Sequence, residues 1–258
     1  MENLIKESDK VMIMGHTNPD IDAMGSSMGI YRLVKSMNKN AYIINSSVGT
    51  ALDNFKEELS KDPEYEDALI SKEVAVENVE ENTLLVIVDT HKKNYVESPE
   101  LLEKTKKIVI IDHHRRSADY IEDATLTFQE VYASSAAELV TELLQYTDTK
   151  VVLKTIEAES LYAGIMMDTK NFTFKTGVRT FEAAAYLRKC GVDIIRVKKW
   201  FQSDLMSFNK IAAIVKSAEI VNGSVAIAIN PKKEKDTSIV CAKAADELLT
   251  ISDITASF

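Results

Sequence analysis

The sequence predicts an α/β protein built on an open, mostly parallel sheet with helices on both faces. Short apolar runs rich in β-branched residues alternate along the chain with longer segments of helical periodicity. This alternation is typical of parallel sheets, because two parallel strands need a long crossover that is usually a helix. The length of 258 residues allows one large domain or two small ones.

Four apolar runs are predicted as strands, and four segments with helical patterns lie after or between them. The predicted strands span residues 11–14, 41–45, 84–88 and 108–111. The predicted helices span residues 22–37, 135–146, 155–167 and 180–190. Ser135 and Glu138 have the spacing of a capping box at the start of the second helix. Gly191 suits the position just past the end of the last helix.

The pattern changes after residue 200, which indicates the start of a second, smaller α/β domain. Residues 203–218 are predicted as a helical connector. Two alternating runs then flank Asn222-Gly223, which is a hairpin signal, and a helical pattern covers residues 241–249. About 40 residues are too few for a comfortable independent core. We therefore expect a catalytic domain over 1–200, a linker over 201–218 and an incomplete domain over 219–258.

Charge and composition limit the expected partners and location. The formal net charge of −9 and the short, scattered basic pairs argue against a long nucleic acid. A small anionic substrate held by metal ions is compatible with this charge. No apolar run approaches the roughly 18–20 residues of a membrane span. The N-terminus lacks the apolar region of a signal peptide, and the two cysteines suggest a reducing compartment. We expect a cytoplasmic chain without membrane contact, although a fragment of a longer protein would also lack a targeting segment.

The four histidines all lie close to an aspartate just past a predicted strand. The segments are GHTNPDID, VDTH and IDHH, and a further aspartate stands in MMDTKNF after the helix at 155–167. Because the carboxyl ends of parallel strands share one crevice, the side chains of these segments should converge there. The expected set is His16, Asp20, Asp22, Asp89, His113 and His114.

A pair of divalent cations would explain this combination of side chains. The four carboxylates of Asp20, Asp22, Asp89 and Asp168 would repel one another strongly in one crevice. Mixed imidazole and carboxylate ligands favour manganese, or iron, cobalt or zinc, whereas magnesium prefers oxygen ligands. Two such ions roughly 3.5–4 Å apart suit an in-line phosphoryl displacement. Taken singly, Asp22 would suit a helix N-cap and Asp168 a helix end, so the joint pattern carries the prediction.

The motifs also carry a family resemblance. GHTNPDIDAMG, VDTH, IDHHRR and MMDTKNFTF stand in the order and approximate spacing of the DHH phosphoesterase motifs, and the resemblance covers essentially the whole chain. This superfamily includes manganese-dependent pyrophosphatases, RecJ-type nucleases, oligonucleotide-trimming enzymes and cyclic di-AMP phosphodiesterases. The chain looks most like the last group, in its membrane-anchored form with PAS and degenerate GGDEF domains. NYVESPELLEK, YASSAAELVTELLQY and TGVRTFEAAAYLRKCG support that subgroup.

The resemblance implies a role for each motif position. One manganese ion would be held by His16, Asp20 and Asp89. The other would be held by Asp22, Asp89, His113 and Asp168, with cobalt, iron or magnesium as substitute metals. His114 would contact the scissile phosphate or protonate the leaving oxygen, and Asp112 would orient an imidazole. Four further roles stay open: His91 as substrate contact or hydrogen-bond donor, Arg115 as phosphate contact or solvated charge, and Ser134 and Ser135 as phosphate ligands or helix caps.

The implied activity is hydrolysis of cyclic di-AMP to linear pApA by a metal-bridged hydroxide that attacks phosphorus. The expected partner is a small cyclic dinucleotide, a homodimer is allowed, and the chain would be a cytoplasmic domain of a membrane-anchored protein. One departure is the absence of a GGGH motif, which belongs to the DHHA1 domain of the family and fits a fragment that ends inside that domain. Two alternatives remain: cleavage of short oligonucleotides or pyrophosphate, and a nucleotide-binding sensor without catalysis.

Overall fold

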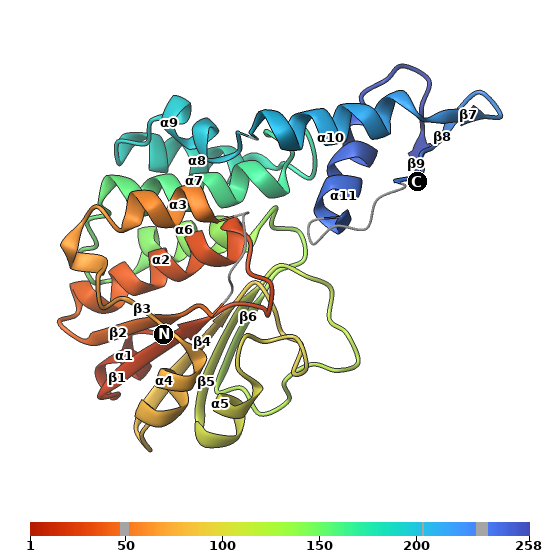
Figure 1. The fold of residues 1–258 in the computed structure, drawn as a ribbon. Coiled ribbons are helices and arrows are strands. Elements are labelled where there is room, and N and C mark those ends of the chain that lie inside the picture. The colour runs from red at the N-terminus through yellow and green to blue at the C-terminus, as the bar shows by residue number, and fades with distance from the viewer. Residues whose placement is uncertain (47–51, 203, 231–236) are drawn as a thin grey trace. The chain divides into compact units, whose positions relative to one another are not determined.

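The computed structural model describes residues 1–46, 52–202, 204–230 and 237–258, and it divides into two compact units, Met1–Phe201 and Gln202–Phe258. The first unit is built on a six-stranded parallel sheet with the order β3-β2-β1-β4-β5-β6 (Figure 1). The strands are β1 (Lys10–Met14), β2 (Asn40–Ile44), β3 (Leu69–Ile70), β4 (Thr83–Val88), β5 (Lys107–Asp112) and β6 (Leu126–Gln129). The predicted parallel α/β sheet is confirmed.

Helices cover both faces of this sheet (Figure 1). One face carries α2 (Ile21–Ser36), α6 (Ala136–Tyr146) and α7 (Thr155–Asp168), and the other carries α4 (Lys72–Asn78) and α5 (Pro99–Lys104). The first unit also contains α1 (Glu2–Lys6), α3 (Asp53–Leu59), α8 (Val178–Lys189), α9 (Ile194–Trp200) and a 3-10 turn at Pro63–Tyr65. Alternate residues of β1 enter the two separate cores, which explains why its sequence is a continuous apolar run.

The close approach of α2 and α7 depends on glycines that face the neighbouring helix. A Cβ atom on Gly25 of α2 would lie 2.3 Å from the carbonyl oxygen of Ser160 in α7. A Cβ atom on Gly164 of α7 would lie 2.7 Å from Oδ1 of Asp22. Both distances are far below an ordinary contact, so only glycine fits at these two positions. This packing brings the start of α2 next to the C-terminal half of α7, where Asp168 is the last residue.

The strand order places a crevice at the centre of the sheet. The chain runs outward from β1 through β2 to β3, and then returns to the other side of β1 with β4, β5 and β6. The order therefore reverses between β1 and β4, and ligands of such sheets bind outside the carboxyl ends of the strands at that point. The segments that follow β1, β4 and β5 contain all four histidines of the chain.

The second unit contains α10 (Leu205–Lys216), β7 (Glu219–Val221), β8 (Val225–Ile227), α11 (Thr237–Leu248) and β9 (Ala256–Ser257). Asn222 and Gly223 both have positive φ, 52° and 74°, and they connect antiparallel β7 and β8, so the predicted hairpin is confirmed. Ile211 and Ile214 of α10 form a small core with α11, so the expected connector helix is also a packing element of this unit. Ser203, where that segment was expected to begin, lies outside the described residues. None of the helices in the described ranges has the length and apolar character needed to cross a bilayer.

Candidate metal centre

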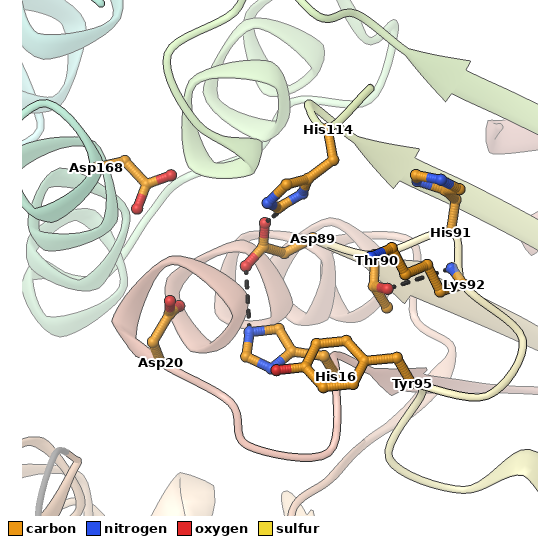
Figure 2. A pocket seen from close by; sticks show the side chains of 9 residues that line it. All are labelled: His16, Asp20, Asp89, Thr90, His91, Lys92, Tyr95, His114 and Asp168. Atoms are coloured by element: carbon orange, nitrogen blue, oxygen red, sulfur yellow. Dashed lines mark hydrogen bonds and ion pairs between the residues drawn. The ribbon is translucent and has the colours of Figure 1, made fainter. Parts of the chain in front are cut away.

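The site lies around Asp89, the first residue after β4. Figure 2 shows its carboxylate between the imidazoles of His16 and His114, with Asp20 and Asp168 beside it. Asp89 is 3% exposed, and its backbone N–H donates to the carbonyl oxygen of Ile111 in β5 at 2.9 Å. Its φ of 59° is unusual for a residue with a side chain. Backbone strain of this kind persists only where the surroundings enforce it, and it concentrates at functional sites.

The start of α2 supplies two carboxylates with different local partners. Asp20 is the N-cap of α2, where its Oδ1 accepts from the N–H groups of Asp22 and Ala23 at 2.9 and 3.1 Å. Asp22 lies two residues further on, in the first turn of α2, and is fully buried. Its two oxygens accept from the N–H groups of Ala136 and Ala137, at 2.8 and 2.9 Å. The N-cap role considered for Asp22 therefore belongs to Asp20, and Asp22 instead joins α2 to the N-terminus of α6.

The imidazoles approach Asp89 from both sides. His16 Nε2 lies 3.5 Å from Asp89 Oδ2, and His113 Nε2 lies 3.4 Å from Asp89 Oδ1. His113 Nε2 is also 3.2 Å from Asp168 Oδ2. Three sets of side chains have potential ligand atoms within 4.8 Å of one another: His16, Asp20 and Asp89; Asp22, His113 and Asp168; and Asp89, His113 and His114.

The electrostatics of this cluster indicate an excess of negative charge. Burial, together with Asp89 and Asp168, raises the pKa of Asp20 to about 6, and the same causes raise the pKa of Asp22 well above its usual value. Burial by itself would lower the pKa of His113, but the carboxylates of Asp168 and Asp89 raise it to about 11. Burial opposes the ionisation of Asp89, but His113 and His16 hold its pKa below the usual range. The carboxylates therefore take up protons or attract cations.

The residues present fit metal ions. Three buried atoms in the cluster have no hydrogen-bond partner among the described residues: His16 Nδ1, Asp89 Oδ1 and His113 Nε2. Two of these, Asp89 Oδ1 and His113 Nε2, face each other across a gap too long for a hydrogen bond. Leaving buried polar atoms unpaired is costly, so this set of atoms is suited to bind a metal ion. The set around His16 and the set around Asp22 are adjacent, because Asp89 of the first set lies 3.4 Å from His113 of the second. The centre therefore has room for ligands of two neighbouring ions.

His114 and His91 share one buried carboxylate, that of Asp112 at the end of β5. His114 Nδ1 lies 2.8 Å from Asp112 Oδ1, and His91 Nδ1 is hydrogen-bonded to Asp112 Oδ2. Burial by itself would raise the pKa of Asp112, but these hydrogen bonds hold it at about 2. The His114 side chain is 54% exposed and lines the pocket, whereas His91 is 2% exposed. Asp112 was expected to orient one imidazole, and in the structure it is hydrogen-bonded to two, those of His91 and His114.

The remaining predicted residues lie at the edge of the site or beneath it. Ser135 is the N-cap of α6, and its Oγ accepts from the N–H of Glu138 at 3.1 Å. Ser134 is also buried, and its hydroxyl donates to the carboxylate of Glu138. Ser135 is therefore engaged in capping α6, whereas the Ser134 hydroxyl is engaged by the Glu138 side chain. Arg115 is exposed and is not among the residues that line the pocket around Asp89.

The sequence did not single out Tyr95 and Glu97, which follow the strand β4 by several residues. The segment 95–97 runs antiparallel to residues 15–17: Thr17 N donates to Tyr95 O at 2.9 Å, and Glu97 N donates to Gly15 O at 3.0 Å. Tyr95 stacks on His16, and Glu97 is buried with one oxygen, Oε2, that has no described hydrogen-bond partner. The stretch NYVESPELLEK contains both residues, but it gave them no role, because a contact between loops leaves no periodic signal in the sequence.

The fold and this centre define a doubly wound α/β protein with a cluster of imidazoles and carboxylates at the switch point of its sheet. Residues 10–165 match the family described as "DHH family, N-terminal domain". The chain belongs to the DHH family.

Similar proteins agree with this assignment. Over its whole length the chain is 39% identical to "Cyclic-di-AMP phosphodiesterase PdeA" of Listeria monocytogenes and 42% identical to "Cyclic-di-AMP phosphodiesterase GdpP" of Geobacillus thermodenitrificans. It spans about 40% of the length of each of these relatives. An exopolyphosphatase-related protein from Bacteroides fragilis has the same fold, with a TM-score of 0.83 over 98% of this chain and 76% of its own, at 20% identity.

Proposed function

We propose that this chain is the catalytic part of a phosphodiesterase that hydrolyses cyclic di-AMP to linear pApA with the help of two manganese ions. The observation that carries the proposal is the convergence of His16, Asp20, Asp22, Asp89, His113 and Asp168 on one crevice. The names of the relatives that match across the whole chain supply the substrate. Mixed imidazole and carboxylate donors favour manganese over magnesium.

Two ligand sets belong to this proposal, and the family resemblance and the proximity of the side chains support them. His16, Asp20 and Asp89 would hold one ion, and Asp22, Asp89, His113 and Asp168 would hold the other. When bound, the two cations would neutralise the carboxylates, activate water and stabilise the charge on the phosphoryl oxygens. The protein holds the ligands rigidly, because Asp20 caps α2 and Asp22 is fixed by the N-terminus of α6. Asp89 is the residue that belongs to both proposed sets.

His114 is suited to act on the leaving group. Its Nδ1 is held by Asp112, and its Nε2 makes no hydrogen bond to any described residue. In the proposed reaction, the oxygen of water forms a new bond to phosphorus, the proton that this water gives up passes to solvent, and the bond from phosphorus to the 3′ oxygen breaks. The imidazolium of His114 donates a proton to that leaving oxygen, and Asp112 stabilises the imidazolium. Arg115, an exposed residue directly after His114, remains a candidate for a further phosphate contact.

The second unit would belong to a substrate-binding domain. We propose that residues 1–200 are the catalytic domain, 201–218 the linking helix and 219–258 part of a substrate-binding domain, as the family resemblance implies. Contacts to the part of a dinucleotide remote from the scissile phosphate raise kcat as well as affinity, because they position the reacting group.

The test is to incubate the chain with manganese and cyclic di-AMP, pApA or pyrophosphate, and to identify the products by chromatography. Formation of pApA from cyclic di-AMP at the highest kcat/KM supports the proposal. Faster cleavage of pApA or pyrophosphate would instead indicate an oligonucleotide-trimming enzyme or a pyrophosphatase. Binding of cyclic di-AMP without any cleavage would indicate a sensor.

A further inference from the structure

His91 is a buried residue in the wall of the pocket, and both of its ring nitrogens have partners. Its Nδ1 is hydrogen-bonded to Asp112 Oδ2, and its Nε2 lies 2.9 Å from the backbone nitrogen of Ser117. The segment that carries Ser117 is held next to the loop that carries His91, because Ile121 N donates to His91 O at 2.9 Å. His91 is thus neither free to turn toward a substrate nor available to a metal ion.

The partners of His91 determine its tautomer. His91 Nε2 lies near two groups of Ser117, the backbone N–H at 2.9 Å and the hydroxyl Oγ at 3.0 Å. The hydroxyl donates its proton to Asp119 Oδ1 at 2.6 Å, whereas a backbone N–H can only donate, so the shorter contact places a lone pair on His91 Nε2. The proton of the neutral ring is then on Nδ1, where it is donated to Asp112 Oδ2. The side-chain amide of Gln129 also approaches Nδ1, at 3.2 Å, but it donates to the carbonyl oxygen of His114 at the shorter distance of 2.8 Å.

His114 receives its orientation from the same carboxylate. Asp112 Oδ1 lies 2.8 Å from His114 Nδ1 and 3.2 Å from the backbone nitrogen of His114. The alternative partner of His114 Nδ1, Asp89 Oδ1, is 3.6 Å away. Because Asp112 is fully buried, the hydrogen bond from His91 to Oδ2 is what keeps Oδ1 aimed at His114. Without the hydrogen bond from His91, the Asp112 carboxylate could rotate away from His114 or take up a proton.

We propose that His91 is a positioning residue for His114, and that it acts through the Asp112 carboxylate that the two imidazoles share. His91 donates from Nδ1 to one oxygen, and the other oxygen accepts from His114 Nδ1, which leaves His114 Nε2 toward the substrate. The consequence for catalysis rests on the proposed function. The consequence for the two tautomers does not, because it follows from the hydrogen bonds alone.

The first experiment measures the tautomers directly in the metal-free chain. The protein has only four histidines, so a two-bond ¹H–¹⁵N correlation spectrum contains four imidazole patterns. His91 should be protonated at Nδ1 and unprotonated at Nε2, and His114 should carry a proton at Nδ1. A His91 ring protonated at Nε2 overturns the proposal without any variant or activity. In His91→Leu, the His114 pattern should shift toward the mixture of tautomers that a free imidazole shows.

The second experiment uses variants that differ in a single hydrogen bond. His91→Asn keeps a side-chain N–H near the position of Nδ1, whereas His91→Leu removes it. With cyclic di-AMP and manganese, His91→Leu should lower kcat by roughly 10–100-fold at unchanged KM, the usual cost of losing a hydrogen-bond partner behind the reacting groups. His91→Asn should restore most of that loss. Lys93→Ala, at an exposed position in the same loop, is the matched control and should behave as wild type.

A comparison of two substrates with different leaving groups distinguishes a positioning role of His91 from a general loss of structure in His91→Leu. Bis-p-nitrophenyl phosphate has a leaving group that needs no proton, so His91→Leu should reduce its hydrolysis much less than that of cyclic di-AMP. Equal losses on both substrates, or equal losses in His91→Asn and His91→Leu, would contradict the proposal. If the unmodified chain hydrolysed neither substrate, the proposed function would fail, and the imidazole spectrum would still decide the role of His91.

Discussion

His16 and Tyr95 stack face to face, with ring centroids 5.2 Å apart and ring planes within 4° of parallel. Tyr95 is 42% exposed, and both residues line the pocket (Figure 2). The imidazole Nδ1 has no described hydrogen-bond partner, so the tyrosine ring and the backbone ladder between residues 15–17 and 95–97 are what define its plane. A ligand held in this way binds a metal ion without first losing rotational freedom.

This stack predicts that Tyr95 supports metal affinity through its ring and not through its hydroxyl. Tyr95→Ala should weaken manganese binding by about 10-fold, the lower end of what the loss of such a support costs. Tyr95→Phe keeps the ring and should bind manganese as the wild type does. Isothermal titration of chelator-treated protein measures both. Equal affinity in Tyr95→Ala and wild type would show that the stack is incidental.

The charge of the crevice predicts two transition-metal ions per chain. Without metal, the carboxylates of Asp20 and Asp22 have raised pKa values because they are buried beside Asp89 and Asp168. Two divalent ions would offset this repulsion and satisfy the unpaired atoms of the cluster. Elemental analysis after loading with manganese should find two ions, and manganese should support more activity than magnesium. One ion or none at saturation would contradict a two-metal mechanism.

Asp89 and His114 should separate metal binding from catalysis. Asp89→Asn should weaken both metal sites, because its carboxylate lies between the two ligand sets. His114→Ala should keep two metal ions but slow the hydrolysis of cyclic di-AMP by roughly 10²–10⁴-fold, the range for loss of a general acid. Metal content and kcat are measured on the same preparations. An equal loss of metal in both variants would show that His114 is a ligand.

Glu2 should contribute a pH-dependent part of the stability. A hydrogen bond from Thr149 is the largest cause that lowers the pKa of Glu2 from 4.5 to about 2, and Thr147 and the backbone N–H groups of Asp148 and Thr149 add to it. A lowered folded-state pKa means that the stabilisation is fully present above pH 4.5 and is lost as the pH falls toward 2. Wild type and Glu2→Gln should therefore differ in urea midpoint at pH 6 and converge near pH 2. The exposed Glu122→Gln is the control, and all samples contain chelator.

The pair Arg32 and Glu157 should be a major contribution to stability between α2 and α7. Arg32 Nε lies 2.8 and 2.9 Å from the two oxygens of Glu157, whose side chain is fully buried. Arg32→Met leaves a buried carboxylate without its cation and should reduce the free energy of unfolding by about 3–5 kcal/mol. Adding Glu157→Gln should recover part of the loss. Lys61→Met removes a surface ion pair and should cost no more than about 1 kcal/mol in chemical denaturation.

The sequence by itself determined the long, regular parts of the fold and the membership of the metal cluster. The four predicted strands and the helices α2, α6, α7 and α8 are present within one or two residues, because burial on both sides of a sheet and helical periodicity leave a local pattern. Convergence of the segments after β1, β4 and β5 followed from the rule that parallel strands end at one edge. The strand β3 and the helices α4 and α5 were not predicted, because two residues of strand and less than two turns of helix are too short to show a period.

Only the tertiary structure decided how each side chain of the cluster is used. That Asp22 is fixed by α6, that Tyr95 stacks on His16, and that His91 and His114 share Asp112 all depend on contacts between segments 20 to 115 residues apart. Sequence spacing says that His91 lies two residues past Asp89, but it does not say which nitrogen faces which carboxylate. That orientation is set by the loop that carries Ser117. Hydrogen bonds are directional, so their partners are fixed only once the backbone of both segments is in place.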